Sequence, residues 1–456
     1  MTASYHPGDR IAGRYEIAGR PLMGGMGIVL VCYDHQEQHP VALKTFRPEF
    51  LPDRAARDRF LRECTIWVNL GSHPHIIQCY QVTQSYVSLE VYLVLELVSK
   101  EKGRADASLR SWLLPGRPLP VETGLLFALQ IARGMKHAVQ TIPGFVHRDL
   151  KPENVLVGAD RLSEANVNRL RVTDFGLARV LEEQRDKLEA TGTGTEGDRG
   201  SLRRTQLTRG IVGTPLYMAP EQWTGEPPDV RTDVYAFGCI LYEMLTGKYA
   251  VVGKTLHELE LAHRGGRVQR LPRKLPTEVT ELVRQCLSVS RNSRYRSWGE
   301  AEAVLTNAYR CVAGKDPPPE MTSESKMPAE QMAVGWSYNA IGISYMEIGN
   351  FNVAVEYFER AVQIGNADSE RLLEAGLVNL GSAYGNLGDS QRAIECFERC
   401  LTISREIGHR AEEGAALGNL AMLISDWAML TEQSSCISRI WQLHERLVIG
   451  LKKGLL

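Results

Sequence analysis

Two short motifs in the middle of the chain constrain its fold and chemistry more than any other feature. The first is the eight-residue string His147–Asn154, which reads His-Arg-Asp-Leu-Lys-Pro-Glu-Asn. The second, Asp174-Phe175-Gly176, begins twenty residues after the first ends. Together they supply the carboxylates, the lysine and the amide side chain that phosphoryl transfer uses. A lone Asp-Phe-Gly is often only a turn, but both motifs in this order and at this spacing rarely arise by chance.

The two motifs resemble the catalytic loop and the metal-binding motif of protein kinases. This resemblance implies that Asp149 accepts the proton of the substrate hydroxyl. It also implies that Asn154 and Asp174 bind Mg²⁺ and that Lys151 contacts the transferring phosphate. A lysine at this place is typical of serine/threonine kinases, so we expect serine and threonine hydroxyls as acceptors.

A later segment agrees with this specificity. Residues 213–221 read Gly-Thr-Pro-Leu-Tyr-Met-Ala-Pro-Glu and resemble the peptide-docking segment of serine/threonine kinases. The resemblance implies that Thr214 bridges Asp149 and Lys151 by hydrogen bonds. A kinase acting on small molecules would not need this segment, so a protein substrate is favoured.

A lysine inside an apolar strand marks the nucleotide-binding part. Lys44 ends the string Val-Ala-Leu-Lys, and an unpaired ammonium in such a place is costly, so it must meet an anion. In the kinase pattern, this lysine binds the α- and β-phosphates of ATP and pairs with a helical glutamate. That glutamate is Glu63, on a helix expected from about residue 53 to residue 70.

The rest of the ATP site follows from the same resemblance, with two departures. Leu22 occupies the place of the first glycine of the phosphate-covering loop, and Trp67 is bulkier than the aliphatic residue expected there. Leu95 is expected behind the adenine, and Glu96 and Val98 are expected to offer it backbone hydrogen bonds. The full expected set is Leu22, Gly24, Gly27, Val29, Ala42, Lys44, Glu63, Leu95, Glu96, Val98 and Leu156.

The segment after Asp174 is predicted to regulate the site. Residues 182–210 are rich in glycine, threonine and charge, a composition that buries too little apolar surface to stay ordered unaided. Arg148 beside the catalytic aspartate marks kinases in which a phosphate on this segment pairs with that arginine. Thr208 is the first candidate phosphosite and Thr205 the second; the alternative is that both are solvated loop residues.

One bracing residue and one ion pair are also expected to hold the structure together. Asp233 resembles the residue that braces the catalytic loop from a central buried helix, which Thr246 and Gly247 end. Arg294 matches the late arginine that pairs with Glu221. His73 and His75 flank a proline, which suits a structural turn better than a metal site.

The C-terminal part of the chain repeats itself. Gly342, Tyr345, Gly349, Ala354 and Phe358 recur 39 residues later as Gly381, Tyr384, Gly388, Ala393 and Phe397. These positions have the internal spacing of tetratricopeptide helix pairs, in which small residues allow close approach and aromatics fill the space. Leu417 begins a third copy that decays at 426–428. Residues 436–448 keep an amphipathic pattern and could act as a cap.

Composition limits the remaining possibilities. A net charge of −1 gives no basis for nucleic-acid binding, and the nine cysteines are scattered without a Cys-x-x-Cys pair. No apolar stretch approaches the ~20 residues that cross a bilayer, and residues 1–20 are polar. We therefore expect a cytoplasmic protein without a membrane span, and the resemblance to protein kinases implies that it uses ATP and Mg²⁺.

The predicted fold class is α+β, a bilobal kinase fold followed by an all-α repeat module. The resemblance is to bacterial Hanks-type serine/threonine kinases and covers residues 14–312, with lobes at 14–98 and 99–312. A proline-containing linker is expected at 313–331, and repeats that recruit partner or substrate proteins at 332–456, the last of them degenerate. The alternative function is a weakly active or inactive interaction scaffold, which only Leu22 and Trp67 favour.

Overall fold

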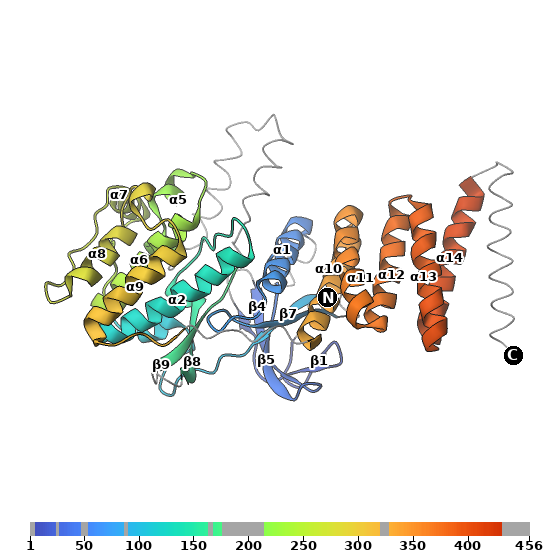
Figure 1. Ribbon diagram of the computed structural model, residues 1–456, viewed down its shortest axis with the longest axis horizontal. Helices are drawn as coiled ribbons and strands as arrows, with labels where there is room; N and C mark the ends of the chain where they lie inside the picture. Colours follow the sequence, from blue (N-terminus) through green and yellow to red (C-terminus); the bar gives the residue numbers. More distant parts are fainter. Residues whose placement is uncertain are drawn as a thin grey trace. The chain divides into compact units, whose positions relative to one another are not determined.

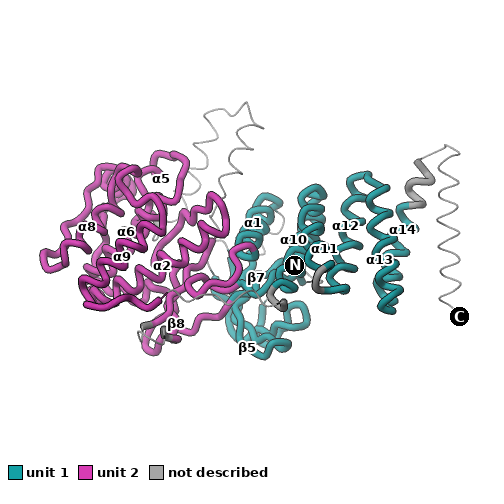
Figure 2. The backbone as a smooth tube through the Cα atoms, in the orientation of Figure 1, with its two compact units in different colours: residues 1–68, 79–95, 324–456 teal, residues 69–78, 96–323 magenta. Residues whose placement is uncertain are grey.

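The computed structural model describes residues 5–23, 27–46, 53–85, 90–162, 167–175, 214–319 and 328–430. The chain divides into two compact units (Figure 2). The sheet–repeat unit comprises residues 1–68, 79–95 and 324–456, and the helical unit comprises residues 69–78 and 96–323. Most of the small lobe expected at 14–98 thus groups with the repeats, whereas residues 69–78 and 96–98 belong to the helical unit.

A seven-stranded sheet, in strand order β1-β2-β4-β5-β7-β6 with β3 paired to β4, forms the first half of the sheet–repeat unit. Apolar side chains of β2, β4, β5 and β7 build its core. The edge strand β6 follows helix α1 (Arg54–Leu70), which begins and ends as the sequence predicts to within one residue. The strands are β1 (Arg10–Ile11), β2 (Tyr15–Ile17), β3 (Leu22–Met23), β4 (Gly27–Asp34), β5 (His39–Phe46), β6 (Cys79–Gln84) and β7 (Val91–Glu96).

The repeats form a row of antiparallel helices, orange to red in Figure 1. Gly342 faces Phe358 so closely that an added Cβ would lie 2.5 Å from its ring, and Gly381 faces Phe397 in the same way. The expected role of the small residues is therefore confirmed. The helices are α10 (Pro328–Glu347), α11 (Phe351–Asp368), α12 (Glu370–Asn386), α13 (Ser390–Ile407) and α14 (Arg410–Leu430).

The ends of the repeat module differ from the sequence expectation in two places. Helix α10 begins at Pro328, so the last four residues of the expected linker 313–331 are helical. Helix α14 continues through 426–428, where the first two repeats have a glycine turn. The possible cap at 436–448 lies outside the described residues.

The helical unit is built around α6 (Val230–Thr246), whose side chains are almost all buried. Asp229 caps its first turn by accepting a hydrogen bond from the Arg231 amide, and Gly247 ends it in the left-handed conformation (φ 66°). The helix thus ends where the sequence predicts. Around it lie α2 (Val121–Thr141), α5 (Pro220–Thr224), α7 (Leu256–Arg264), α8 (Thr277–Cys286), α9 (Trp298–Ala313) and the hairpin β8 (Val155–Leu162) and β9 (Val167–Val172).

Candidate active site

The predicted lysine–glutamate pair is formed. Lys44 lies on β5 and Glu63 on α1, with 2.5 Å between Nζ and Oε1. The two side chains are 17% and 8% exposed. A pair this sheltered is screened less than a surface pair, so the carboxylate holds the ammonium in place on the sheet.

Trp67 has a role that the sequence did not reveal. Its indole is 1% exposed, and its Nε1 donates to Glu63 Oε1 at 3.4 Å, one helical turn away. The sequence showed only that this residue is bulkier than the aliphatic residue expected there. The structure adds a polar contact to the same carboxylate oxygen that meets Lys44.

The strands that carry the expected phosphate-covering residues are partly described. Leu22 is 60% exposed on β3, while Ala42 is buried on β5. A Cβ on Gly27 would lie 2.8 Å from the Thr45 carbonyl oxygen, so this glycine is needed for strand pairing as well as for any phosphate contact. Val29 pairs with Lys44 across the two strands. Gly24 lies outside the described residues.

The catalytic loop brings three predicted residues together in the helical unit. Lys151 Nζ lies 2.6 Å from Asp149 Oδ2, and the Asn154 amide donates to the Asp149 carbonyl at 2.8 Å and to Oδ2 at 3.2 Å. Asp149 Oδ1 is buried and accepts no hydrogen bond from the described residues. One carboxylate oxygen is therefore fixed by neighbours, whereas the other has no partner among the described residues.

A buried carboxylate on the central helix α6 braces the catalytic loop. Asp233 on α6 accepts the backbone amides of His147 at 2.7 Å and Arg148 at 2.8 Å, as the sequence predicts for a brace. Burial raises the pKa of Asp233 to about 6. Arg148 (φ 68°) and Asp174 (φ 65°) adopt left-handed backbone conformations that are rare outside glycine, and such strain persists only where the surroundings impose it.

The second motif is tied to the loop through its neighbour. The amide of Thr173 donates to the Asn154 carbonyl at 2.9 Å, and the His147 ring donates to the Thr173 carbonyl at 3.1 Å. These contacts fix the chain at Asp174, which follows directly. Gly176, the last residue of the motif, lies outside the described residues.

The side-chain oxygens of the predicted metal-binding residues are of the type that suits the expected ATP and Mg²⁺. Both hydrogen bonds of the Asn154 side chain are made by its nitrogen, so its oxygen takes part in neither. An amide oxygen and a carboxylate are ligands that Mg²⁺ prefers, and Asp174 supplies the carboxylate. Residues Asn154 and Asp174, both in the helical unit, would hold the metal.

The strand end expected beside the adenine is braced by charge. Glu96 Oε1 lies 2.8 Å from Arg171, which also pairs with Asp160. The Glu96 amide already donates to the Gln78 carbonyl at 2.8 Å, so of the two backbone groups only its carbonyl could serve the base. Leu95 is buried on β7, Val98 follows it by three residues, and Leu156 lies on β8.

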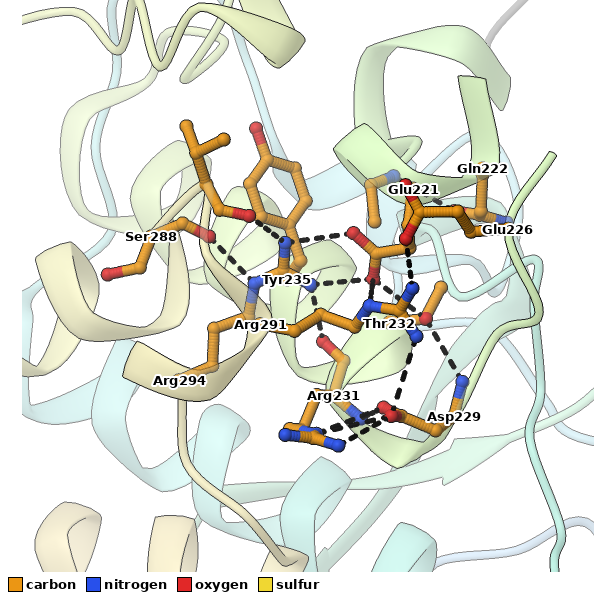
Figure 3. A network of polar contacts seen from close by, with 12 residues as sticks. Glu221, Gln222, Glu226, Asp229, Arg231, Thr232, Tyr235, Ser288, Arg291 and Arg294 are labelled. Carbon is orange, nitrogen blue, oxygen red and sulfur yellow. Dashed lines mark hydrogen bonds and ion pairs between the residues drawn. The ribbon is translucent and has the colours of Figure 1, made fainter. Parts of the chain in front are cut away.

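The predicted pair of Glu221 and Arg294 is confirmed and lies at the centre of a polar network (Figure 3). The guanidinium contacts both carboxylate oxygens at 2.7 and 2.9 Å. It also donates to the carbonyls of Ser288, Arg231 and Val289. This network fixes α5 at the end of the expected peptide-docking segment.

Some predictions fall outside what the structure describes. The candidate phosphosites Thr205 and Thr208 lie there, as does most of the segment that carries them. Thr214 begins a 3₁₀ helix (Thr214–Tyr217), but its side chain is not among those described. Its bridging of Asp149 and Lys151 stays a prediction.

Arg110 is a further residue of the site that the sequence did not suggest. It lies on a 3₁₀ helix (Leu109–Trp112) and pairs with Glu153 of the catalytic loop at 2.8 Å and with Glu243 of α6 at 2.6 Å. It also donates to the Tyr217 hydroxyl. One guanidinium thus links the catalytic loop, the central helix and the docking segment.

His73 and His75 form the structural turn that we expected. Burial lowers their pKa values to about 3 and about 4, so both rings are neutral. His73 Nδ1 accepts the His75 amide, and the His75 ring donates to the Leu170 carbonyl. No cluster of three or more His, Cys, Asp or Glu residues suited to a metal occurs in the described part of the chain.

Comparison with known families agrees with this geometry. The protein kinase domain profile matches residues 23–309, which is more than half of the chain. The chain belongs to the protein kinase family. The tetratricopeptide repeat profile matches residues 337–366 and 375–407, which confirms the repeats predicted from the 39-residue offset.

Bacterial kinases are among its relatives. It is 28% identical over 316 residues to the serine/threonine-protein kinase PknB of Mycobacterium leprae, covering 68% of this chain and 44% of that protein. It is 32% identical over 321 residues to PknA of Mycobacterium tuberculosis, covering 68% and 64%. A Streptomyces coelicolor protein named a probable serine/threonine-protein kinase is 30% identical over 311 residues, covering 67% and 41%. The chain thus matches less than two thirds of each relative's length.

Proposed function

We propose that this chain is a protein serine/threonine kinase that transfers the γ-phosphate of ATP to protein hydroxyls with the help of Mg²⁺. The observation that carries the proposal is the catalytic loop, where Asp149 Oδ2 is held by Lys151 and Asn154 while buried Oδ1 has no partner among the described residues. A carboxylate held in this way suits the orientation of an incoming hydroxyl and the acceptance of its proton.

The other side chains supply position and charge. Lys44, held by Glu63, orients the α- and β-phosphates, and Lys151 balances charge on the group in transfer. Asn154 and Asp174 would hold the metal. When bound, ATP supplies the phosphoryl group and Mg²⁺ neutralises part of its charge. Lys151 and the names of the bacterial relatives support serine and threonine as acceptors.

The proposal has three further parts. Phosphorylation of Thr208 or Thr205 would switch the site on through Arg148, because a phosphate brings about −1.5 to −2 charges to a guanidinium. The repeats would recruit partner or substrate proteins, since arrays of this kind present extended binding surfaces. A cytoplasmic location stays a prediction. Among the described helices, none has the length and apolar character needed to span a bilayer.

Mass spectrometry of the purified chain tests the proposal. The chain is incubated with ATP and Mg²⁺, beside an Asp149→Asn variant whose amide cannot accept the proton. We expect phosphate on Thr208 or Thr205 in the first sample and a loss of about 10²- to 10⁴-fold in its rate in the second. Equal phosphate in both samples would overturn the assignment of Asp149. No phosphate in either, with ATP binding intact, would favour the interaction scaffold.

A further inference from the structure

The first tetratricopeptide repeat packs against the small lobe, inside the sheet–repeat unit. Its hydroxyl groups reach helix α1. The Tyr357 hydroxyl lies 2.7 Å from Thr65 Oγ1, and the Tyr345 hydroxyl donates to Asp58 at 3.4 Å. Because the Thr65 hydroxyl already donates its proton to the Leu61 carbonyl, Tyr357 is the donor in its contact. Tyr345 and Tyr357 stack with ring centroids 5.5 Å apart, so one aromatic block makes both contacts.

A carboxylate of the same repeat joins α1 to the sheet. Glu347, the last residue of α10, accepts from Arg57 of α1 at 3.0 Å and from Gln84 of β6 at 2.7 Å. Its side chain is 18% exposed, and burial raises its pKa above the ordinary value. Because the two oxygens serve different elements, the repeat fixes the distance between the helix and the sheet edge.

The repeat also covers the sheet edge. The Val82 amide on β6 donates to Ser337 Oγ of α10 at 2.9 Å, and the Ser337 hydroxyl in turn donates to the Ala333 carbonyl. An exposed edge strand invites pairing with other chains, and proteins commonly cover it. Here the covering element is the helix that also contacts α1 through Tyr345.

These contacts lie on the face of α1 that is opposite Glu63. At 3.6 residues per turn, Asp58 and Thr65 stand about 140° to 160° around the helix from Glu63, and Trp67 stands only about 40° from it. A rotation or shift of α1 that withdraws Glu63 from Lys44 must therefore also disturb the contacts on the outer face.

We propose that the first repeat positions Glu63: by holding the outer face of α1, it keeps the Glu63 carboxylate at Lys44 and thereby sets the affinity of the site for ATP. Tyr357 and Glu347 are positioning residues in this arrangement. The inference rests on the proposed kinase function. A protein that binds the repeats and moves α10 or α11 would change ATP affinity, and ATP would by linkage change the affinity for that protein.

The experiment compares two tyrosine-to-phenylalanine variants of the full chain. Tyr357→Phe removes one hydroxyl and keeps the aromatic stack. Tyr384→Phe is the matched control, because its hydroxyl donates to Glu359 within the repeats at 2.8 Å and both rings are buried. The measurements are the affinity for ATP with Mg²⁺, the phosphorylation rate at varied ATP, and amide hydrogen exchange over residues 54–70.

We expect Tyr357→Phe to weaken ATP binding about 3- to 10-fold and to speed exchange in α1, since a single hydrogen bond contributes on this scale. The KM for a peptide substrate should not change. Tyr384→Phe should match the unmodified chain in all three measurements.

A second comparison separates positioning from general stability. In a Glu63→Gln background, Tyr357→Phe should weaken ATP binding no further, because the group it positions is gone. Additive losses, or no effect of Tyr357→Phe in the unmodified chain, would overturn the inference. ATP affinity and hydrogen exchange need no catalysis, so they decide it even where no phosphate transfer is found and the proposed function fails.

Discussion

Two ion pairs in this kinase-family chain differ sharply in how they are enclosed. The side chains of Arg294 and Glu221 are 0% and 3% exposed, and the guanidinium contacts both carboxylate oxygens and three carbonyls. Lys44 remains 17% exposed and meets a single oxygen of Glu63. The first pair is a permanent part of the helical unit. The second joins a strand to a helix that the repeats hold from the other side, and can change with the position of that helix.

The largest effect is expected from breaking the Arg294–Glu221 pair, which is the more deeply buried of the two. Arg294→Met leaves the Glu221 carboxylate buried without its cation, which should lower the free energy of unfolding by about 3–5 kcal/mol. Urea denaturation followed by circular dichroism measures this change. Adding Glu221→Gln should restore part of the loss because it removes the uncompensated charge. A loss below about 1 kcal/mol in the single variant would show that the pair is not the brace described here.

A buried carboxylate that is held by backbone amides sharpens the comparison. Asp233 is held by two backbone amides, and burial raises its pKa from 3.8 to about 6 in the folded chain. The folded state therefore binds a proton more tightly than the unfolded state. Its contribution to stability is fully present below about pH 4 and is lost as the pH rises towards 6.

The measurement is the difference in unfolding free energy between the unmodified chain and Asp233→Asn, taken across this pH range. As the pH rises through this range, the unmodified chain should lose about 3 kcal/mol of unfolding free energy relative to Asp233→Asn, at 1.36 kcal/mol for each pKa unit. A difference that does not vary with pH would mean that the two amides, rather than burial, set the pKa of this carboxyl.

Breaking the Lys44–Glu63 pair should affect activity rather than stability. Glu63→Gln keeps the size of the side chain but removes the charge that holds Lys44. We expect the kcat/KM for ATP to fall about 10- to 100-fold, because a hydrogen bond to a charged group contributes about 1.5–3 kcal/mol. The melting temperature should stay within about 2 °C. A large loss of stability would contradict the contrast between the two pairs.

The sequence predicted the parts of the molecule that leave a local or periodic signal. The catalytic loop, helix α1 and the 39-residue repeats were predicted from motifs or spacing, and both ion pairs and the Asp233 brace from the resemblance to protein kinases; the structure or the family profiles contain them. Each of these features consists of residues whose type, order or period is itself unusual.

The features that escaped prediction join residues far apart in sequence. Arg110 meets Glu243 across 133 residues, and Thr65 meets Tyr357 across 292. A repeat period shows which helix faces pack within the array, but it does not show which isolated polar side chains meet another part of the chain. The contact of the first repeat with α1 therefore had no signal in the sequence.

The smallest effect is expected from the contact that Trp67 makes with the Glu63 carboxylate of the Lys44–Glu63 pair. Trp67→Phe removes the indole nitrogen that lies 3.4 Å from Glu63 Oε1, a long and neutral hydrogen bond. We expect the KM for ATP to rise about 2- to 3-fold, since a contact of this kind contributes at the low end of the range for hydrogen bonds. Steady-state kinetics at varied ATP measures it.

Trp298→Phe is the matched control for this prediction. Trp298 is also 1% exposed, and its Nε1 has no hydrogen-bond partner among the described residues. The same loss of ring volume from a core should leave the KM for ATP unchanged. Equal changes in both variants would mean that Trp67 acts through packing alone. A change confined to Trp67 would mean that the Glu63 carboxylate is held in place from its own helix as well as by Lys44. The Lys44–Glu63 pair would then differ from the Arg294–Glu221 pair in how many contacts hold its carboxylate, and not in the type of those contacts.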